Sequence, residues 1–223
     1  MSLDVKLETE RLILRPWKET DAENLYAYAS DPEVGPPAGW PPHTSVENSR
    51  EIIKGVLSRK ETYAICLRDG KPIGSIGLHL NGSTDMTDRD DECELGYWIG
   101  KPFWGQGLIP EAARELLRYA FEKLDMRAVW CGYYDGNDKS SRVQEKLGFV
   151  YHHKTEAIEV KLMKEIRTGH CNLMTKERWQ KVELFRNQKK TLDLFREKNA
   201  ISQAQYTKSL GDLIERMEMR GVK

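Results

Sequence analysis

A glycine turn between an aromatic, strand-like segment and a helix-like segment is the first feature of this chain that could do chemistry. Residues 94–99 read Glu-Leu-Gly-Tyr-Trp-Ile, Gly105 and Gly107 follow in a tight turn, and Pro110 is typical of a helix start. Backbone N–H groups in such a turn point outward at the positive end of a helix dipole, a geometry that binds phosphate. The sequence therefore predicts an anion site here, with an ordinary strand–turn–helix that binds nothing as the alternative.

Sheet and helix patterns alternate on both sides of this turn. Strands are expected at 8–17, 63–67, 73–80, 94–99, 128–134, 149–152 and 172–174, and helices at 20–28, 46–57, 110–124 and 137–147. Asp69-Gly70 between two apolar runs predicts a hairpin, and Gly148 is expected to end a helix in the left-handed conformation. The charged residues 153–171 are expected to contain little strand. This order predicts an α+β domain over residues 1–175.

The C-terminal residues 176–223 carry a different pattern, that of a helical hairpin. Apolar residues recur at helical spacing in two runs: Val182, Phe185, Leu192 and Phe195, then Tyr206, Leu210, Leu213 and Met217. Ser202 stands where it would cap the second helix. A hairpin of this size buries too little apolar surface to be stable alone, so we expect it to dock on the domain or on a second subunit in a homodimer.

Bulk composition excludes several classes of protein. Lys+Arg and Asp+Glu are 35 each, so net charge gives no indication of a nucleic-acid partner. No run of 18 apolar residues and no signal-peptide pattern is present, so we expect no membrane partner and a cytoplasmic location. The four cysteines and five histidines show no metal-ligand spacing. We therefore expect no metal, and cysteines that are small core residues in a reducing compartment.

Five ordered signatures together resemble the Gcn5-related N-acetyltransferases (GNAT). The glycine turn is similar to their pyrophosphate loop, Gln/Arg-x-x-Gly-x-Gly/Ala, although Pro102 stands at its first position, as in the ribosomal-protein alanine N-acetyltransferase branch. The other four are residues 8–15, Asp31-Pro32, residues 94–99, and Asn137-x-x-Ser140 with residues 145–149. The resemblance covers 8–175 and implies a mixed, mostly antiparallel sheet with a splayed central strand flanked by helices. Residues 192–213 resemble the short SHOCT-type helical hairpin.

The resemblance implies acetyl-CoA as co-substrate and assigns residues to its parts. The pyrophosphate would meet the loop residues Trp104, Gly105, Gln106, Gly107 and Leu108. The pantetheine would pair with the strand edge at Trp98, Ile99 and Gly100, where one N–H could polarise the thioester carbonyl. Asn137 would contact the pantetheine arm, cap the following helix, or do both.

Amine acetylation also needs a base, because an alkyl ammonium with a pKa near 10.4 must lose its proton before it attacks. Glu94 is the candidate, since by the resemblance it enters the cleft strand from the acceptor side. A carboxylate in a surface ion pair is the alternative for Glu94, and a water relay is the alternative for the base. Glu92 and His79 are weaker candidates.

The thiolate that leaves coenzyme A needs an acid. Many relatives use a Tyr four residues before the glycine that closes the short helix, but Gln144 stands there. In the ribosomal-protein branch a Ser has this role, which implies Ser140 as acid and as part of the cofactor site; a helix-capping hydroxyl is the alternative. Tyr133 and Tyr134 are further candidates.

The acceptor side is expected in two loops. Residues 31–43 are rich in proline and include Trp40, which suits a lid that excludes water. Residues 85–92 hold five acids, which would attract a cationic amine. We therefore predict an acetyl-CoA-dependent N-acetyltransferase that acts on a protein N-terminus or a small polyamine-like acceptor. The alternative is a catalytically weak acyl-CoA-binding regulatory or scaffold protein whose hairpin contacts a partner.

Overall fold

The computed structural model describes residues 5–219 and divides the chain into two compact units, 1–173 and 174–223. Each unit is described by itself below. The first contains nearly all of one sheet with its covering helices, and the second is mainly a pair of helices.

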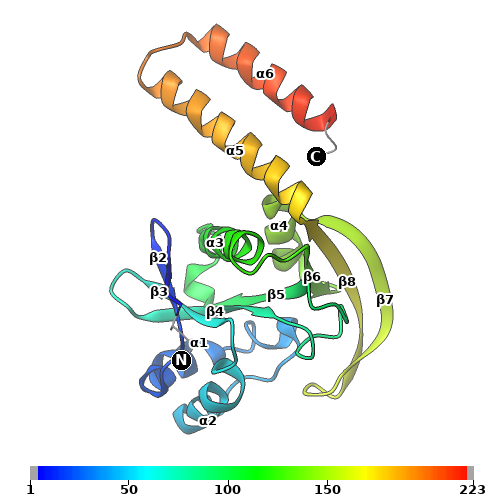
Figure 1. Ribbon diagram of the computed structural model, residues 1–223. Helices are drawn as coiled ribbons and strands as arrows, with labels where there is room; N and C mark the ends of the chain where they lie inside the picture. Colours follow the sequence, from blue (N-terminus) through cyan, green and yellow to red (C-terminus); the bar gives the residue numbers. More distant parts are fainter. Residues whose placement is uncertain (1–4, 220–223) are drawn as a thin grey trace. The chain divides into compact units, whose positions relative to one another are not determined.

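One eight-stranded sheet, in the order β1-β2-β3-β4-β5-β6-β8-β7, forms the centre of the first unit (Figure 1). The strands are β1 Leu7–Glu8, β2 Leu12–Arg15, β3 Thr62–Leu67, β4 Pro72–His79, β5 Glu92–Ile99, β6 Ala128–Tyr134, β7 Val150–Val160 and β8 Glu165–Thr175. Successive strands from β1 to β5 pair antiparallel, as do β7 and β8, whereas β5 and β6 run parallel. The expected mixed, mostly antiparallel sheet is thus confirmed.

Helices cover both faces of this sheet, with α3 and α4 over one face and α1 and α2 over the other (Figure 1). Their bounds are α1 Ala22–Ala29, α2 Val46–Ile52, α3 Leu108–Glu122 and α4 Asp138–Leu147. The apolar stripe of α3, which includes Leu116 and Phe121, is fully buried. The Ser45 hydroxyl caps α2 by accepting from the Asn48 N–H, and Gly148, at φ 94°, ends α4. Among the described residues, no helix has the length and apolarity to cross a membrane.

The central strands part after a short stretch of pairing. All pairs between β5 and β6 lie from Glu92↔Ala128 to Glu94↔Trp130, while β5 pairs with β4 as far as Ile99↔Gly74. A Cβ at Gly96 would lie 2.7 Å from His79 Nε2, so glycine there leaves room for the His79 ring, while a Cβ at Gly74 of β4 would lie 2.4 Å from the Trp98 carbonyl oxygen, so glycine there permits the close approach of β4 to β5. Residues 95–99 of β5 therefore keep a backbone edge that β6 does not cover, which confirms the expected splayed strand.

The expectation of little strand over residues 153–171 is wrong. β7 and β8 form a long antiparallel hairpin through this stretch, with register shifts between Tyr151 and His153 and between Thr155 and Ile158. Nearly all of β7 is exposed on both faces, so its sequence carries charges without the apolar alternation that marks a half-buried strand. The Lys154–Glu156 ion pair is typical of this exposed edge.

The second unit consists mainly of α5 Lys176–Glu197 and α6 Gln203–Met219. The Ser202 hydroxyl accepts from the Gln205 N–H, as expected of a cap, and the Tyr206 hydroxyl donates to Asp193 Oδ1 at 2.6 Å between the helices. Leu213 is buried in the seam, whereas Phe195 is 45% exposed. The SHOCT-type resemblance, the hairpin's docking and the boundary at 175/176 stay predictions.

Phe121→Ala is expected to lower the free energy of unfolding by about 3–5 kcal/mol, because a fully buried ring is removed from beneath α3. Phe195→Ala is the matched control and should cost less than about 1 kcal/mol, because that ring is largely exposed in α5. Urea unfolding of both variants measures the difference, and equal losses would contradict the assigned core.

Candidate active site

The predicted anion loop has free backbone donors. Gly105 and Gly107 both have φ 74°, in the left-handed region that favours glycine, and Gly107 is the N-cap of α3. Among the described residues, the N–H groups of Gly105, Gln106 and Gly107 have no hydrogen-bond partner, and Leu108 opens the first turn of α3. Together these N–H groups form a cradle that fits a pyrophosphate.

Arg11 of the N-terminal segment stabilises this loop. Its Nη1 donates to the Gln106 carbonyl at 3.0 Å and its Nε to Glu111 at 2.6 Å. Burial raises the pKa of Glu111, but bonds from Thr9 and Arg11 outweigh it and hold the pKa below its usual value. The acid in the first turn of α3, Glu111, is therefore paired with Arg11. Sequence reasoning missed Arg11, because its partners lie about 100 residues away.

The free edge of β5 presents alternate residues to the gap beside β6. The Gly100 N–H donates to the Ile73 carbonyl at 2.8 Å, within the sheet. Antiparallel alternation therefore directs the backbone groups of Leu95, Tyr97 and Ile99 into the gap. The carbonyl of Leu95 accepts from Cys131 Sγ at 3.2 Å, and that of Ile99 from the Trp104 indole at 2.9 Å. This edge thus offers a ligand backbone N–H donors together with the Tyr97 carbonyl.

The side chains of Trp98 and Glu94 lie on one face of β5, and that of Tyr97 lies on the other. Trp98 contacts Trp40 of the proline-rich segment edge-on, with ring centroids 5.6 Å apart. Glu94 lies in the last pair with β6, opposite Trp130, and its Oε2 accepts from the Thr84 hydroxyl at 2.6 Å. Burial raises the pKa of Glu94, while the Thr84 bond partly offsets that rise. A carboxyl with a raised pKa at a cleft suits a general base.

The weaker base candidates, Glu92 and His79, also contact neighbouring side chains or strands. Glu92 Oε2 accepts from the Trp130 indole at 2.7 Å and from the Thr87 hydroxyl at 2.9 Å, and Arg89 lies 3.4 Å from its other oxygen. Arg89 also pairs with Asp91, so two of the five acids in this loop share one guanidinium, which offsets one of their two negative charges. His79 is in register with Glu94, and its ring packs over Gly96.

Ser140 lies in the first turn of α4, across the gap from β5. Its Oγ is 3.0 Å from the Tyr97 hydroxyl and accepts from Gln144 Nε2 at 3.2 Å. Asn137 caps α4 by accepting from the Ser140 N–H, and its Nδ2 also donates to the Pro37 carbonyl at 3.2 Å. Asn137 thus links α4 to the lid segment. Tyr97 was missed from the sequence, because no local pattern shows that it meets a helix 43 residues away.

Residues 35–42, the proline-rich part of the expected lid, contact strands on both sides of the gap between β5 and β6. The Pro36 carbonyl accepts from Arg167 Nη1 of β8 at 2.6 Å, and Trp40 meets Trp98 of β5. A Cβ at Gly39 would lie 3.0 Å from the Tyr134 ring, so the segment packs closely on β6. These contacts place the proline-rich segment beside Trp98 and Tyr134, and its role as a water-excluding lid stays a prediction.

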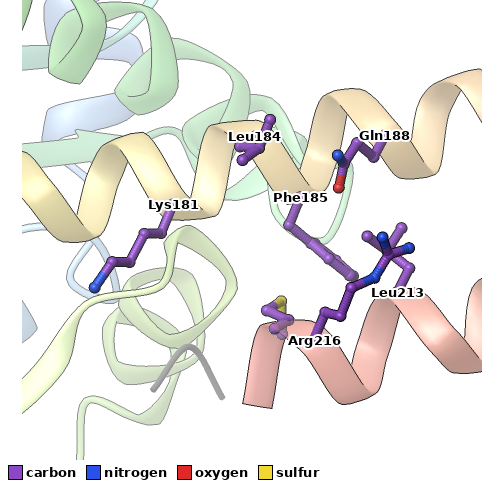
Figure 2. A pocket seen from close by; sticks show the side chains of 7 residues that line it. Lys181, Leu184, Phe185, Gln188, Leu213 and Arg216 are labelled. Atoms are coloured by element: carbon purple, nitrogen blue, oxygen red, sulfur yellow. The ribbon is translucent and has the colours of Figure 1, made fainter. Parts of the chain in front are cut away.

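A separate hollow lies between α5 and α6 in the second unit (Figure 2). It is lined by Lys181, Leu184, Phe185, Gln188, Leu213, Arg216 and Met217. Apolar side chains and two cations surround it, with no carboxylate or hydroxyl that could handle a proton. It is therefore not a candidate for the acetyl-transfer site.

Comparison with known families shows to which family the first unit belongs. The family model described as the acetyltransferase (GNAT) domain matches residues 11–150. The chain belongs to the GNAT acetyltransferase family. The matched region contains the anion loop, the free edge of β5, Glu94 and Ser140, so the GNAT domain and this site coincide.

Individual relatives agree with this assignment. YdaF of Bacillus subtilis (strain 168), provisionally named a ribosomal N-acetyltransferase, is 43% identical over 84 residues, which are 38% of this chain and 43% of that protein. The uncharacterized N-acetyltransferase YoaA of the same strain is 30% identical over 64% of this chain and 81% of its own length. The [ribosomal protein uS5]-alanine N-acetyltransferase of Escherichia coli (strain K12) is 27% identical over 65% of this chain and 78% of its own length. A GNAT-family structure from Bacillus anthracis shares the fold, with TM-score 0.67 and 20% identity over 78% of this chain and 99% of that one.

Family membership and the names of these relatives indicate acetyl-CoA-dependent acetyl transfer. The residues present fit coenzyme A, because the loop N–H groups are free, the first-turn acid is paired, and the β5 edge offers donors.

Gly107→Glu is expected to weaken acetyl-CoA binding by about tenfold or more, because it places a carboxylate against the phosphates at the start of α3. Gly70→Glu is the matched control: Gly70 has φ 84° in the β3–β4 turn, so the backbone strain is similar but the site is distant in the fold. Isothermal titration calorimetry measures both, and equal affinities for the two variants would remove the loop as the phosphate site.

Proposed function

We propose that this GNAT protein transfers the acetyl group of acetyl-CoA to a primary amine by direct attack on the thioester. One observation carries the proposal: Glu94 and Ser140 approach the same gap in the sheet from its two faces, beside a loop of free N–H donors. A base on one side and a hydroxyl donor on the other are what amine attack and thiolate departure require.

In this proposal the chain binds acetyl-CoA, the acetyl donor, through backbone groups. Gly105, Gln106, Gly107 and Leu108 hold the pyrophosphate, and the free β5 edge pairs with the pantetheine. The Ile99 N–H, which points into the gap, is the donor for the thioester oxygen, since the Gly100 N–H is used within the sheet. Asn137 adds an amide beside the pantetheine path, and acetyl-CoA supplies the activated acetyl group.

Glu94 removes a proton from the attacking ammonium. The raised pKa of Glu94 makes its carboxylate a stronger base than an exposed glutamate, and Thr84 holds Oε2 in place at 2.6 Å. Ser140 donates a hydrogen bond to the departing sulfur from the other side of the gap. The two groups come from opposite faces of the sheet, which keeps base and acid apart.

The acceptor is proposed to be cationic, either a protein N-terminus or a small polyamine-like amine. Asp85 and Asp88 of the acidic loop have no ion-pair partner among the described residues, and Asp85 interacts electrostatically with Glu94. The ribosomal-protein names of YdaF and the Escherichia coli relative favour a protein N-terminus, as in the ribosomal-protein alanine branch.

A free-thiol release assay with acetyl-CoA and three amines tests this function: an alanine-initiated peptide, spermidine and benzylamine. The peptide is given added lysines, so that it and spermidine each carry several positive charges whereas benzylamine carries one. The peptide and spermidine are expected to react faster than benzylamine, because Asp85 and Asp88 attract positive charge. Equal rates would contradict the acidic loop as acceptor determinant. Coenzyme A binding without turnover of any amine would favour a regulatory acyl-CoA-binding protein instead.

The pH dependence of the rate tests Glu94. The base acts when ionised, so the rate should fall as the pH drops through the pKa of Glu94, which lies above the usual value of 4.5. Thr84→Val removes a hydrogen bond that stabilises the ionised form, so it should move this acid limb to higher pH.

Thr87→Val is the matched control, because its hydroxyl bonds Glu92 instead, and it should leave the acid limb unmoved. Glu94→Gln should lower kcat by roughly 10²–10⁴-fold and leave acetyl-CoA affinity near normal. An unchanged rate in Glu94→Gln would remove Glu94 as the base.

A further inference from the structure

Gln144 is a buried amide whose orientation is fixed by its surroundings. Its Nε2 donates to the Gly132 carbonyl at 3.1 Å, and its Oε1 accepts from Asn172 Nδ2 at 2.7 Å. A backbone carbonyl can only accept, so the amide nitrogen must face Gly132. The second N–H of that nitrogen is then a fixed donor to Ser140 Oγ at 3.2 Å.

Tyr97 is a second donor beside the same hydroxyl. Its Oη lies 3.0 Å from Ser140 Oγ and 3.3 Å from the Ser140 carbonyl. Burial raises the pKa of Tyr97 well above its usual value, so the phenol stays protonated across the physiological range. Tyr97 therefore always has a proton to donate, and its nearest acceptors both belong to Ser140.

A serine hydroxyl has two acceptor lone pairs and one O–H donor. Gln144 fills one lone pair of Ser140, and Tyr97 can fill the other. We propose that Tyr97 and Gln144 are positioning residues that saturate the acceptor capacity of Ser140 and leave its O–H as a donor for the sulfur of coenzyme A. This inference rests on the proposed function, in which Ser140 faces the departing thiolate.

The hydrogen bonds among Ser140, Tyr97 and Gln144 have a second arrangement, in which both hydroxyl protons have an acceptor without a ligand. Ser140 can donate to Tyr97 Oη while Tyr97 donates to the Ser140 carbonyl. When sulfur becomes negative, the Ser140 proton turns to it and the Tyr97 proton turns to Ser140 Oγ. Only two hydroxyl rotations separate these states, and no heavy atom has to move.

Tyr97 is not the source of the proton. Its raised pKa makes a phenolate less favourable than a coenzyme A thiolate, so a proton relay from Tyr97 to sulfur would run uphill. Glu94 passes the first proton, taken from the ammonium, to water before attack. As the neutral amine nitrogen bonds to the acetyl carbon, the C–S bond breaks with its electron pair on sulfur, and the Glu94 carboxylate takes the second proton from the nitrogen. The Ser140 hydrogen bond stabilises that charge until water supplies the proton.

The pKa of the thiol of bound coenzyme A tests the network without an acceptor. A hydrogen bond to the thiolate lowers this pKa, so thiolate ultraviolet absorbance should show a lower value in the wild-type complex than in either Ser140→Ala or Tyr97→Phe. We expect each variant to raise it by about one unit. Tyr63→Phe is the matched control: it also removes a buried hydroxyl, bonded to Glu61 at 2.6 Å, and should not move the thiol pKa.

A double-mutant cycle on kcat separates positioning from a general loss of structure. With the fastest of the three amines above, Tyr97→Phe should lower kcat about tenfold and leave the KM for acetyl-CoA unchanged. In the Ser140→Ala background, Tyr97→Phe should have no further effect, because Tyr97 acts only through Ser140. Gln144→Met, which keeps volume and removes the donor, should behave like Tyr97→Phe if thermal unfolding shows that it folds.

The outcomes distinguish this inference from the proposed function. A raised thiol pKa in Ser140→Ala but not in Tyr97→Phe or Gln144→Met overturns the positioning network and keeps Ser140 as the donor. An unchanged thiol pKa and kcat in Ser140→Ala removes Ser140 as the donor and with it the positioning network, but leaves the proposed acetyl transfer standing. Additive losses of kcat in the double variant would show that Tyr97 acts independently of Ser140.

Discussion

The short parallel pairing of β5 with β6 is the constraint on which the rest of the site depends. Only three residue pairs join these strands, so Leu95, Tyr97 and Ile99 of β5 turn backbone groups toward the gap. Buried backbone groups need partners. The carbonyls of Leu95 and Ile99 obtain theirs from Cys131 and from the Trp104 indole, whereas the N–H groups between them are left for a ligand. Because Tyr97 also turns its carbonyl toward the gap, the edge offers both donors and an acceptor, which in the proposed function match the amide groups of a pantetheine.

The two-residue period of the same strand sorts the reacting groups onto two faces. Glu94 and Trp98 face the side of α1, α2 and the lid, while Tyr97 faces α4 and meets Ser140. A base and a hydroxyl donor can thus lie close to one gap without neutralising each other. Burial on the Glu94 side raises the pKa of its carboxyl, and burial on the other side keeps Tyr97 protonated. One strand thereby supports opposite proton-handling tasks.

Elements whose structure depends on residues close together in the sequence could be predicted from the sequence. These include the glycine loop, the helix caps at Ser45 and Gly148, and the strand around Glu94, because turn chemistry and apolar spacing act over a few residues. The β7–β8 hairpin could not be predicted, since an exposed strand has no apolar alternation. Arg11 was also missed, because it joins the site across 95 residues of chain and reads locally as a surface charge.

Gln144 shows what the structure adds to a pattern read from the sequence. The sequence suggested that an acid was lost where relatives have a tyrosine. The structure shows that this position is fully buried and that its amide joins α4 to β6 and β8 through Gly132 and Asn172. A phenol there would leave those polar partners unsatisfied, at a cost of about 1–3 kcal/mol each. In the proposed function the hydroxyl donor is therefore Ser140 of α4, with Tyr97 of β5 behind it.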